Sequence, residues 1–417
     1  MIRINRLAAK TLLLLMTSSL AHAAAQDPFS LYLQSTYVEQ ATLGFRDPYH
    51  GPNSLTPNSG RETLDMTAFA GSRLWVGAEF WVNVEVDQGY GLDDTLGVAG
   101  FPSAEAYKVG SNSPYLRLPR AFIRQTVNLA DRTDAVESAP NQVAASRSPD
   151  RWVLTVGKLS VVDIFDTNQY AHDPRGDFLN WSIVDTGSFD YAADAWGYSV
   201  GAAAEWYAGS WALRAGVFDL SDVPNSTRLD PGFHEFQMVG EIERRYALLG
   251  QSGRIMLTAF DSRGRMRLLD EGISSAAIRQ YRSRQGLSLD LEQPLSPRLG
   301  MFARVGKAAG NVEAYEFSDI DRTRATGLSL KGIDWGRPSD TFGLAGVIRS
   351  LSGQSVCTCN GNRRRRQVRT NPRSVSCRWV RSIPRSRRML AAAARSRSLS
   401  MQIGVTHRLE ALLETRP

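Results

Sequence analysis

A long run of alternating apolar and polar side chains is the feature that most limits how this chain can fold. In Leu74–Asp87 every even-numbered residue is apolar. The odd-numbered positions include Glu79, Trp81, Asn83 and Glu85. This patterning predicts one continuous strand with an oily face and a wet face. A strand this long suits a tilted membrane crossing better than the usual strand of a soluble protein.

The same alternation recurs in pairs of segments joined by short turns. Tyr198–Trp206 and Trp211–Phe218 flank the turn Ala208-Gly209-Ser210, and Glu205 and Arg214 fall on their wet faces. The oily faces of these two segments hold Tyr198, Val200, Ala202, Ala204 and Trp206, then Trp211, Leu213, Ala215 and Val217. A further pair carries Leu287, Leu289 and Leu291 before the Pro294–Pro297 turn, and Leu299, Met301, Ala303 and Val305 after it.

Repeated alternation predicts an all-β fold, a transmembrane antiparallel up-and-down β-barrel. Long loops are expected opposite the short turns, at 46–61, 87–115, 130–150, 163–190 and 219–234. With about 20–25 residues per strand and its connections, about 16 strands would fill the chain, about 13 of them before residue 351. The alternative, an array of soluble β-sandwiches, is disfavoured because Gly, Ala and Ser opposite charged residues would make a poor dry core.

Charge divides the chain into unlike parts. Residues 351–417 hold fifteen Arg and no Lys against Glu410 and Glu414, a net charge of +13, and the first 23 residues add +3. The total of +7 leaves −9 for residues 24–350. The three cysteines all lie in the basic tail, at Cys357, Cys359 and Cys377. An acidic, cysteine-free body does not suit nucleic-acid binding, and it fits an envelope protein without disulfides.

The N-terminus predicts export. Three basic residues precede the apolar stretch Leu12–Met16, and Ala21-His22-Ala23 forms a small-residue cleavage site. A buried N-terminal helix is the disfavoured alternative. We therefore expect a signal peptide over 1–23, a barrel over 24–350 and an atypical tail over 351–417.

No motif in the sequence predicts a catalytic residue, a metal site or a cofactor. Gly197–Gly201 has the G-x-S-x-G spacing of a nucleophile elbow around Ser199, but it lies in an alternating strand rather than at a strand–turn–helix junction. The histidines beyond the leader have no zinc-binding spacing. Acidic residues and a histidine share one loop, where Asx turns are favoured over a calcium site: Asp163, Asp166, His172, Asp173 and Asp177.

We predict that the wet faces line an aqueous channel. The lining residues expected from the alternation are Glu79, Trp81, Asn83 and Glu85, then Arg120, Phe122 and Arg124, and further along Glu205 and Arg214. Carboxylates and guanidinium groups hydrogen-bond sugar hydroxyls, and aromatic rings stack on the apolar faces of pyranoses. The alternative is the charged lumen common to all porins.

Several blocks resemble the carbohydrate-selective outer-membrane porins, the OprB-like family, over roughly 30–350. They are TYVEQATLGFRDPYHGPNSL at 36–55, TLGVAGFPSAEAYKVG at 95–110, PRAFIRQT at 119–126, VGKLSVVDIFDTNQYAHDPRGDFLNW at 156–181, FDYAADAWGYSVG at 189–201, LRAGVFDLSDVPN at 213–225, EFSDIDRT at 316–323 and WGRPSDTFGLAGV at 335–347. The resemblance implies a sixteen-stranded barrel through which mono- and oligosaccharides diffuse without ATP or ion coupling.

The tail departs from this resemblance. Its arginines, its cysteines and its lost periodicity suggest translation from a shifted reading frame, which comparison of the three nucleotide frames would test. Met401–Leu409 alternates, but Arg363–Arg366 could not face hydrocarbon. We therefore expect an incomplete barrel that inserts poorly or is unstable.

Together these features predict a passive carbohydrate channel in the bacterial outer membrane. Its expected partners are small sugars and outer-membrane lipid, with no nucleic acid, and both monomer and homo-oligomer (a trimer) stay open. The alternatives are a non-selective general porin, a barrel hydrolase using Ser199, and a structural envelope protein without conductance. Liposome swelling rates across sugars of equal size test the non-selective porin. Loss of activity in Ser199→Ala would support the hydrolase, and single-channel recording tests for the absence of conductance.

Overall fold

A computed structural model describes residues 28–47, 56–92, 110–224, 226–230, 232–269, 279–316, 318–338 and 340–352, and the backbone of 397–407. The predicted signal peptide 1–23, the three cysteines and Arg363–Arg366 lie outside the described residues. In the described part of the chain, no helix has the length and hydropathy needed to cross a membrane.

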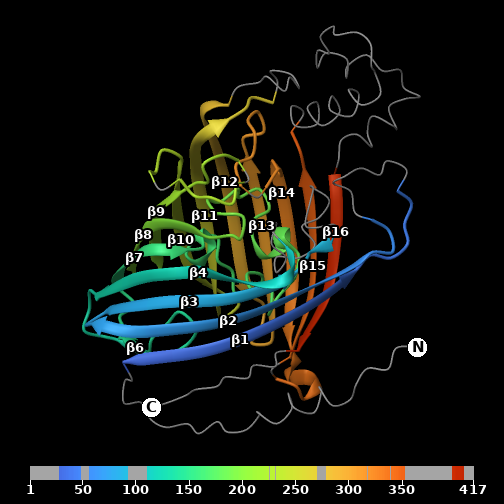
Figure 1. Cartoon of the computed structure of the whole chain (residues 1–417). Coiled ribbons are helices and arrows are strands. Elements are labelled where there is room, and N and C mark those ends of the chain that lie inside the picture. The colour runs from blue at the N-terminus through green and yellow to red at the C-terminus, as the bar shows by residue number, and fades with distance from the viewer. Residues whose placement is uncertain are drawn as a thin grey trace, which may run out of the picture.

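Fourteen strands form one antiparallel sheet in which each strand pairs with the next along the chain (Figure 1). They are β1 Phe29–Ala41, β2 Gly60–Trp75, β3 Ala78–Gly89, β4 Ser111–Asn128, β7 Arg151–Leu159, β8 Ser199–Ala208, β9 Trp211–Asp219, β10 Phe236–Leu248, β11 Gln251–Met266, β12 Gln280–Pro294, β13 Leu299–Ala308, β14 Arg322–Lys331, β15 Asp340–Ser350 and β16 Arg397–His407. The short strands β5 Asp134–Val136 and β6 Ala145–Arg147 pair separately. Thirteen strands of the main sheet precede residue 351, as predicted, and β16 comes from the tail.

The wall is oily outside and polar inside. In β12, Leu287 is 53% and Leu289 39% exposed, whereas Ser288 and Asp290 between them are buried. β8 and β9 follow the same rule, with Val200 and Leu213 exposed and Glu205 and Arg214 buried. Since burying polar groups and exposing apolar ones would be unfavourable in water, this inverted arrangement is the one a lipid-facing barrel requires.

Leu74–Asp87 is a hairpin, so the prediction of one continuous strand was wrong. β2 ends at Trp75 and β3 begins at Ala78, with Gly77 at a φ of 75° in the turn. A bulge between Arg73 and Trp75 adds one residue to β2. Residues paired across the hairpin, such as Arg73 and Glu79, are therefore both odd-numbered or both even-numbered. The bulge keeps the alternation in phase through the turn, which is why the sequence shows no break there.

The connection 129–150 lies at the opposite end of the barrel from the one predicted. Along the chain, short connections (76–77, 209–210, 249–250, 295–298 and 332–339) alternate with long ones. Residues 129–150 join β4 to β7 at the short-turn end, so this long segment is an exception there. We call it the turn-side insert.

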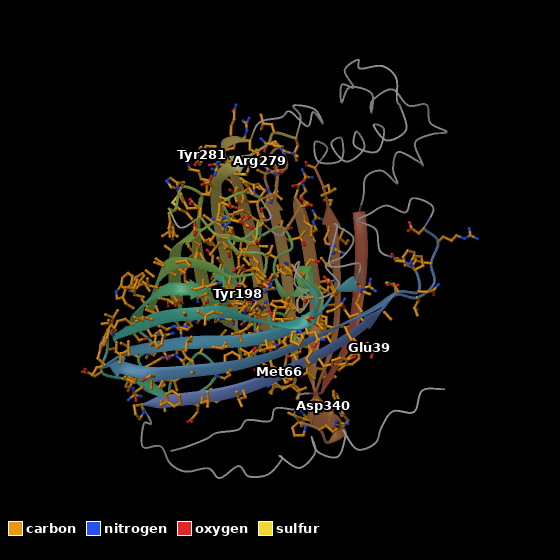
Figure 2. The ribbon with its side chains drawn as sticks, viewed as in Figure 1. Glu39, Met66, Tyr198, Arg279, Tyr281 and Asp340 are labelled. Carbon is orange, nitrogen blue, oxygen red and sulfur yellow. The ribbon has the colours of Figure 1, made fainter. Side chains whose placement is uncertain are left out.

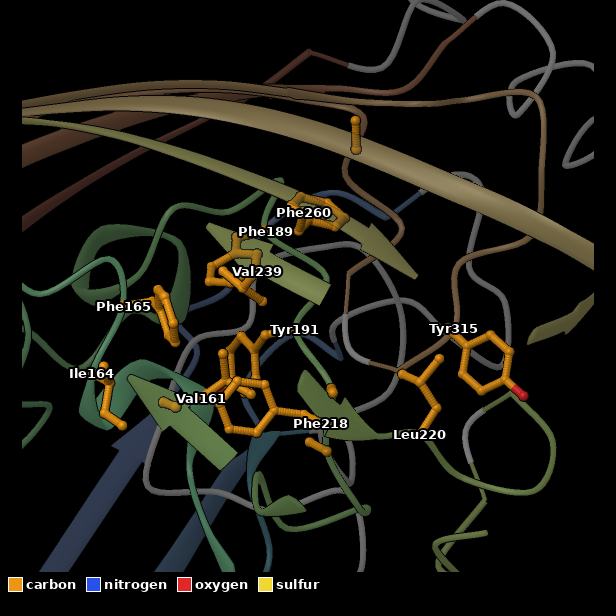
Figure 3. Close-up of a cluster of buried hydrophobic side chains, with 14 of the residues drawn as sticks. Val161, Ile164, Phe165, Phe189, Tyr191, Phe218, Leu220, Val239, Phe260 and Tyr315 are labelled. Carbon is orange, nitrogen blue, oxygen red and sulfur yellow. The ribbon is translucent and has the colours of Figure 1, made fainter. Parts of the chain in front are cut away.

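The apolar core lies inside the barrel rather than between two sheets (Figure 3). Residues 160–198, the inner loop, connect β7 to β8 and contain the short helices η3 Val161–Asp163 and α2 Trp181–Val184. Its Phe165 packs edge-on against the inward-facing Phe218, with ring centroids 6.0 Å apart. Its Phe189 packs at a tilt against the inward-facing Phe260, with ring centroids 5.1 Å apart. The inner loop therefore fills part of the lumen and narrows it.

Candidate functional site

Arg304 of β13 fixes the inner loop to the wall. Its fully buried guanidinium donates to the carbonyls of Ile183 and Val184, both at 2.7 Å, and to that of Asp166 at 2.9 Å. The same group donates to the Asp290 carboxylate of β12 at 2.6 Å. One side chain thus satisfies three loop carbonyls and one wall carboxylate, which holds α2 in place inside the barrel.

A second buried arginine fixes the far part of the inner loop. Arg284 of β12 donates to the Asp190 carboxylate at 2.6 Å and to the Ser318 carbonyl at 3.0 Å. The Asp190 carboxylate also accepts the backbone N–H groups of Tyr315 and Ser318, at 2.7 and 3.1 Å. The inner loop and the 309–321 connection are therefore joined through one carboxylate.

Two of the predicted lining residues, Glu205 and Arg214, meet on the inner face. Arg214 donates to Glu205 at 3.3 Å, and also to Glu241 at 2.6 Å and Glu243 at 2.7 Å. Glu241 in turn accepts the backbone N–H of Asp166 at 2.8 Å. Both predicted residues are buried in this network, which contacts the inner loop through the hydrogen bond between Glu241 and Asp166.

Glu79 and Trp81 lie on the inner face but beneath the turn-side insert. The Glu79 carboxylate accepts the Trp81 indole N–H at 3.1 Å and the backbone N–H of Val143 at 2.8 Å. Arg124 bridges the two segments, since it donates to Glu79 at 3.1 Å and to the Asn141 carbonyl at 2.8 Å. Trp81 is 0% exposed.

Phe122 shares this covered position. It is 3% exposed and packs in a cluster whose members come from four strands and the insert: Tyr32, Phe69, Trp81, Phe122 and Val143. The two aromatic rings predicted for sugar stacking therefore anchor the turn-side insert, and both are covered by protein.

Asn83, Glu85 and Arg120 lie further along the same wall. The β3–β4 register shifts at Leu118 and Pro119, where β4 has one residue more than β3. Arg117 therefore pairs with Glu85 and Arg120 with Asn83, and both arginines point inward. Sequence reasoning missed Arg117 because strict alternation from Arg120 excludes it. Pro119 was the available signal, since proline inside a strand is typical of bulges.

The inward arginines are matched by carboxylates. Arg120 makes two hydrogen bonds to Asp163 of the inner loop, at 2.6 and 2.7 Å, and Arg117 contacts both Glu85 and Asp87. Although burial acts in the opposite direction, the Arg120 guanidinium lowers the pKa of Asp163. Asn83 is fully buried on this wall.

Tyr198 faces inward, so its predicted place on an oily face was wrong. It precedes β8, after Gly197 at a φ of 100°, and the Asp194 carboxylate accepts its backbone N–H at 3.2 Å. The guanidinium carbons of Arg117 and Arg120 lie 5.3 and 5.0 Å from its ring centroid. The irregular backbone at Gly197 places Tyr198 and its neighbour Ser199 on the same side of the wall.

Arg117, Arg120, Tyr198 and Trp196 together form what we call the arginine–aromatic cluster. Trp196 is partly exposed, lies 6.0 Å from the Arg117 guanidinium carbon and donates its indole N–H to the Tyr115 hydroxyl at 3.1 Å. The cluster sits where both ends of the inner loop meet the wall. It combines hydrogen-bond donors, acceptors and ring faces, the groups that a polyhydroxylated ring requires.

Acidic side chains of the inner loop accept hydrogen bonds from backbone N–H groups of the same loop. Asp173 accepts the backbone N–H of Arg175, two residues further on, at 3.0 Å, which is the Asx turn that the sequence favoured over a calcium site. Asp177 accepts the backbone N–H groups of His172 and Asp173, both at 2.9 Å. Among the described residues, one set of possible metal ligands is within 4.8 Å of one another: Asp230, His234 and Glu235. Glu235 is already bound by Arg265 at 2.6 Å.

Ser199 is the first residue of β8 and donates its hydroxyl to the Asp219 carbonyl at 2.6 Å. A strand rather than a helix follows it, and its hydroxyl is bound to a backbone carbonyl, so it lacks the strand–turn–helix geometry of a nucleophile elbow.

Burial keeps Asp185 and His172 uncharged at neutral pH. Burial and the nearby Asp166 carboxylate raise the pKa of Asp185 to about 8, while burial and Arg304 lower the pKa of His172. The 3.9 Å contact between the two side chains is therefore not an ion pair at pH 7. The folded chain holds a proton on Asp185 that the unfolded chain releases near pH 4, so this group's contribution to stability falls as pH rises from about 4 through about 8.

We predict that Asp185→Asn flattens this pH dependence. The wild-type free energy of unfolding should fall between pH 5 and pH 7 by about 3 kcal/mol more than that of the variant, because each of the two pH units corresponds to about 1.4 kcal/mol for one proton. Urea unfolding followed by tryptophan fluorescence at the two pH values measures the difference. Equal losses in both proteins would show that Asp185 is ionised in the folded chain.

Comparisons with known proteins agree with this geometry. The family model "Carbohydrate-selective porin, OprB family" matches residues 63–365. The solved structure of Pseudomonas putida OprB at high pH has 14% identity and a TM-score of 0.60, covering 82% of this chain and 80% of that one. Salmonella typhi OmpF in complex with daunomycin has 9% identity and a TM-score of 0.36, covering 76% of this chain and 89% of that one. A search of curated protein sequences finds no match.

The matched model spans well over half of the chain, and the P. putida structure has the same barrel fold. The family is one of channels rather than enzymes, so the hydrolase alternative through Ser199 is excluded. The chain belongs to the OprB family of carbohydrate-selective porins and is a β-barrel channel of the bacterial outer membrane.

Proposed function

We propose that this channel passes neutral sugars by diffusion and that the arginine–aromatic cluster makes the selective contact. The observation that carries the proposal is the pairing of its charges. Arg120 is bound to Asp163, and Arg117 to Glu85 and Asp87, beside the rings of Tyr198 and Trp196. Paired charges keep their hydrogen-bonding capacity but present little net field, which favours an uncharged polyol over an ion.

Of the nine lining residues predicted from sequence, we assign direct sugar contact to Arg120 and Arg124, whose side chains are 18% and 19% exposed. Glu85 orients Arg117. The others, buried under the inner loop or the turn-side insert, act by positioning: Glu79, Trp81, Asn83, Phe122, Glu205 and Arg214. This division accounts for the buried aromatic rings without giving them a contact with the sugar.

Liposome swelling tests the proposal. Glucose should enter faster than glucuronate or glucosamine of nearly equal size. Trp196→Ala should reduce the rate for glucose severalfold, because Trp196 is the partly exposed ring of the cluster and one ring–sugar contact contributes about 1 kcal/mol. Tyr281→Ala, on the outer face and half exposed, is the matched control (Figure 2). Equal rates for the three solutes, unchanged in the Trp196 variant, would indicate a non-selective porin.

We further propose the division into a leader over 1–23, a barrel over 24–350 and a tail over 351–417 that adds strand β16. Support comes from the pairing of β16 with β15 from Asp340–His407 to Ser350–Arg397. An unclosed sheet edge costs several kcal/mol per unsatisfied backbone group in lipid. A heat-modifiability gel of outer-membrane fractions should show a weak or absent folded band for the full chain, and a sharp folded band would contradict this expectation.

A further inference from the structure

Three cations gather on the outer face of the barrel near its long-loop end. Lys307 is the last residue but one of β13, and Arg322 and Arg324 are the first and third residues of β14. The two strands lie side by side (Figure 1). All three side chains are exposed. They fall on the lipid-facing side, because their strand neighbours Thr323 and Ala325 are buried. We call Lys307, Arg322 and Arg324 the rim patch.

The rim patch sets like charges against each other. Lys307 and Arg322 are directly paired across the β13–β14 ladder, and Arg324 is two residues further along β14. Like charges directly opposite each other on neighbouring strands destabilise a sheet. Within the described residues, none of the three has an ion-pair partner. Other arginines at this end do, since Arg265 binds Glu235 at 2.6 Å and Arg279 binds Glu313 at 2.8 Å.

Apolar side chains surround the rim patch on the same outer face. Lys307 is paired with Leu287 on its other side, and Arg324 lies between Val305 and Ile348. These apolar neighbours are 46–53% exposed and belong to the oily surface of the wall. The cations therefore lie at the long-loop edge of the lipid-facing apolar surface, where long basic side chains extend toward the lipid headgroups.

We propose that the rim patch binds phosphate groups of an anionic lipid in the leaflet that faces the long loops. A phosphate between Lys307 and Arg322 would offset their repulsion, and guanidinium groups bind phosphate oxygens in pairs. Ser350, paired with Arg322 on β15, adds a hydroxyl beside it. The proposal needs only the outward face of the barrel and does not depend on the sugar preference.

Native mass spectrometry of the full chain in detergent tests the proposal, with diphosphorylated lipid A as the probe. Removing one cation near an anionic headgroup costs about 1 kcal/mol, so Arg324→Gln should weaken binding about fivefold and the Lys307→Gln, Arg322→Gln, Arg324→Gln triple variant about 100-fold. Dephosphorylated lipid A should bind the unmodified chain as weakly as the phosphorylated form binds the triple variant.

Lys331→Gln is the matched control, because Lys331 is an exposed cation at the other end of the same strand, β14. It should leave binding within about twofold. The triple Lys307→Arg, Arg322→Lys, Arg324→Lys variant preserves the charges and should bind, which separates loss of charge from loss of folding. Equal weakening by Arg324→Gln and Lys331→Gln, or equal binding of both lipids, would overturn the proposal. Displacement by inorganic phosphate at the same concentration as the lipid would show a free-phosphate site instead.

Discussion

Arg304→Ala should both destabilise the barrel and widen its channel. The substitution removes the donor to three loop carbonyls and the charged partner of Asp290, which keeps, within the described residues, only the neutral Asn168 amide as a side-chain donor, at 2.8 Å. Breaking a buried charged pair by removing one partner costs about 3–5 kcal/mol. Because Arg304 ties α2 to the wall, the part of the inner loop around α2 should also leave its position in the lumen, while Arg120 and Arg284 still hold the loop elsewhere.

Two readouts measure these effects. The urea midpoint should fall, and the single-channel conductance of the surviving folded protein should rise severalfold with weaker discrimination between sugars. Arg298→Ala is the matched control, since Arg298 lies half exposed in the β12–β13 turn and, among the described residues, its guanidinium pairs with Asp334 alone. A stable Arg304→Ala variant with unchanged conductance would show that the other contacts of the inner loop, such as those of Arg284 and Arg120, hold it without Arg304.

Glu79→Ala should release the turn-side insert. The carboxylate accepts hydrogen bonds from Trp81, Val143 and Arg124, and Arg147 lies 3.4 Å away. Loss of the carboxylate leaves these buried donors unsatisfied, and each unsatisfied donor lowers the free energy of unfolding by about 1–3 kcal/mol. Because the structure around them can relax, we expect the free energy of unfolding to fall by about 3 kcal/mol in total. The short-turn mouth should then open, which would raise conductance while leaving the arginine–aromatic cluster intact.

Protease access from the short-turn side gives a direct readout of this release. Cleavage within 129–150 should become rapid in Glu79→Ala and slower in Glu79→Gln, which keeps one acceptor oxygen. Glu62→Ala is the control, because Glu62 is an exposed carboxylate at the long-loop end of β2 that accepts the Tyr37 hydroxyl at 2.8 Å. Resistance to cleavage in Glu79→Ala would mean that the cluster around Phe69 and Val143 suffices to hold the insert.

The faces of the strands could be read from the sequence, because alternation in a strand depends only on local geometry. Glu205, Arg214 and Ser288 all lie on the buried side, as expected. The bulges could not be read in the same way. The one before Trp75 preserves the alternation, and the one at Pro119 shifts it, which hid the inward Arg117.

The parts that fill the lumen could not be predicted, because they depend on contacts between residues far apart in the chain. Nothing local to Arg304 identifies Ile183 as its partner 121 residues away. Likewise, nothing in 129–150 distinguishes a segment that covers Trp81 from one that extends into solvent. Those two segments cover much of the inner face, so alternation along a strand could not give the surface that a solute meets.

The account depends most directly on the outward direction of the apolar side chains. The test is a nitroxide scan of Leu287, Ser288 and Leu289 in β12 of the lipid-reconstituted chain, with the three native cysteines replaced by serine. Collision rates with dissolved oxygen, which concentrates in the acyl chains, should be high at Leu287 and Leu289 and low at Ser288. Uniform rates, or a maximum at Ser288, would contradict the barrel orientation and with it the channel.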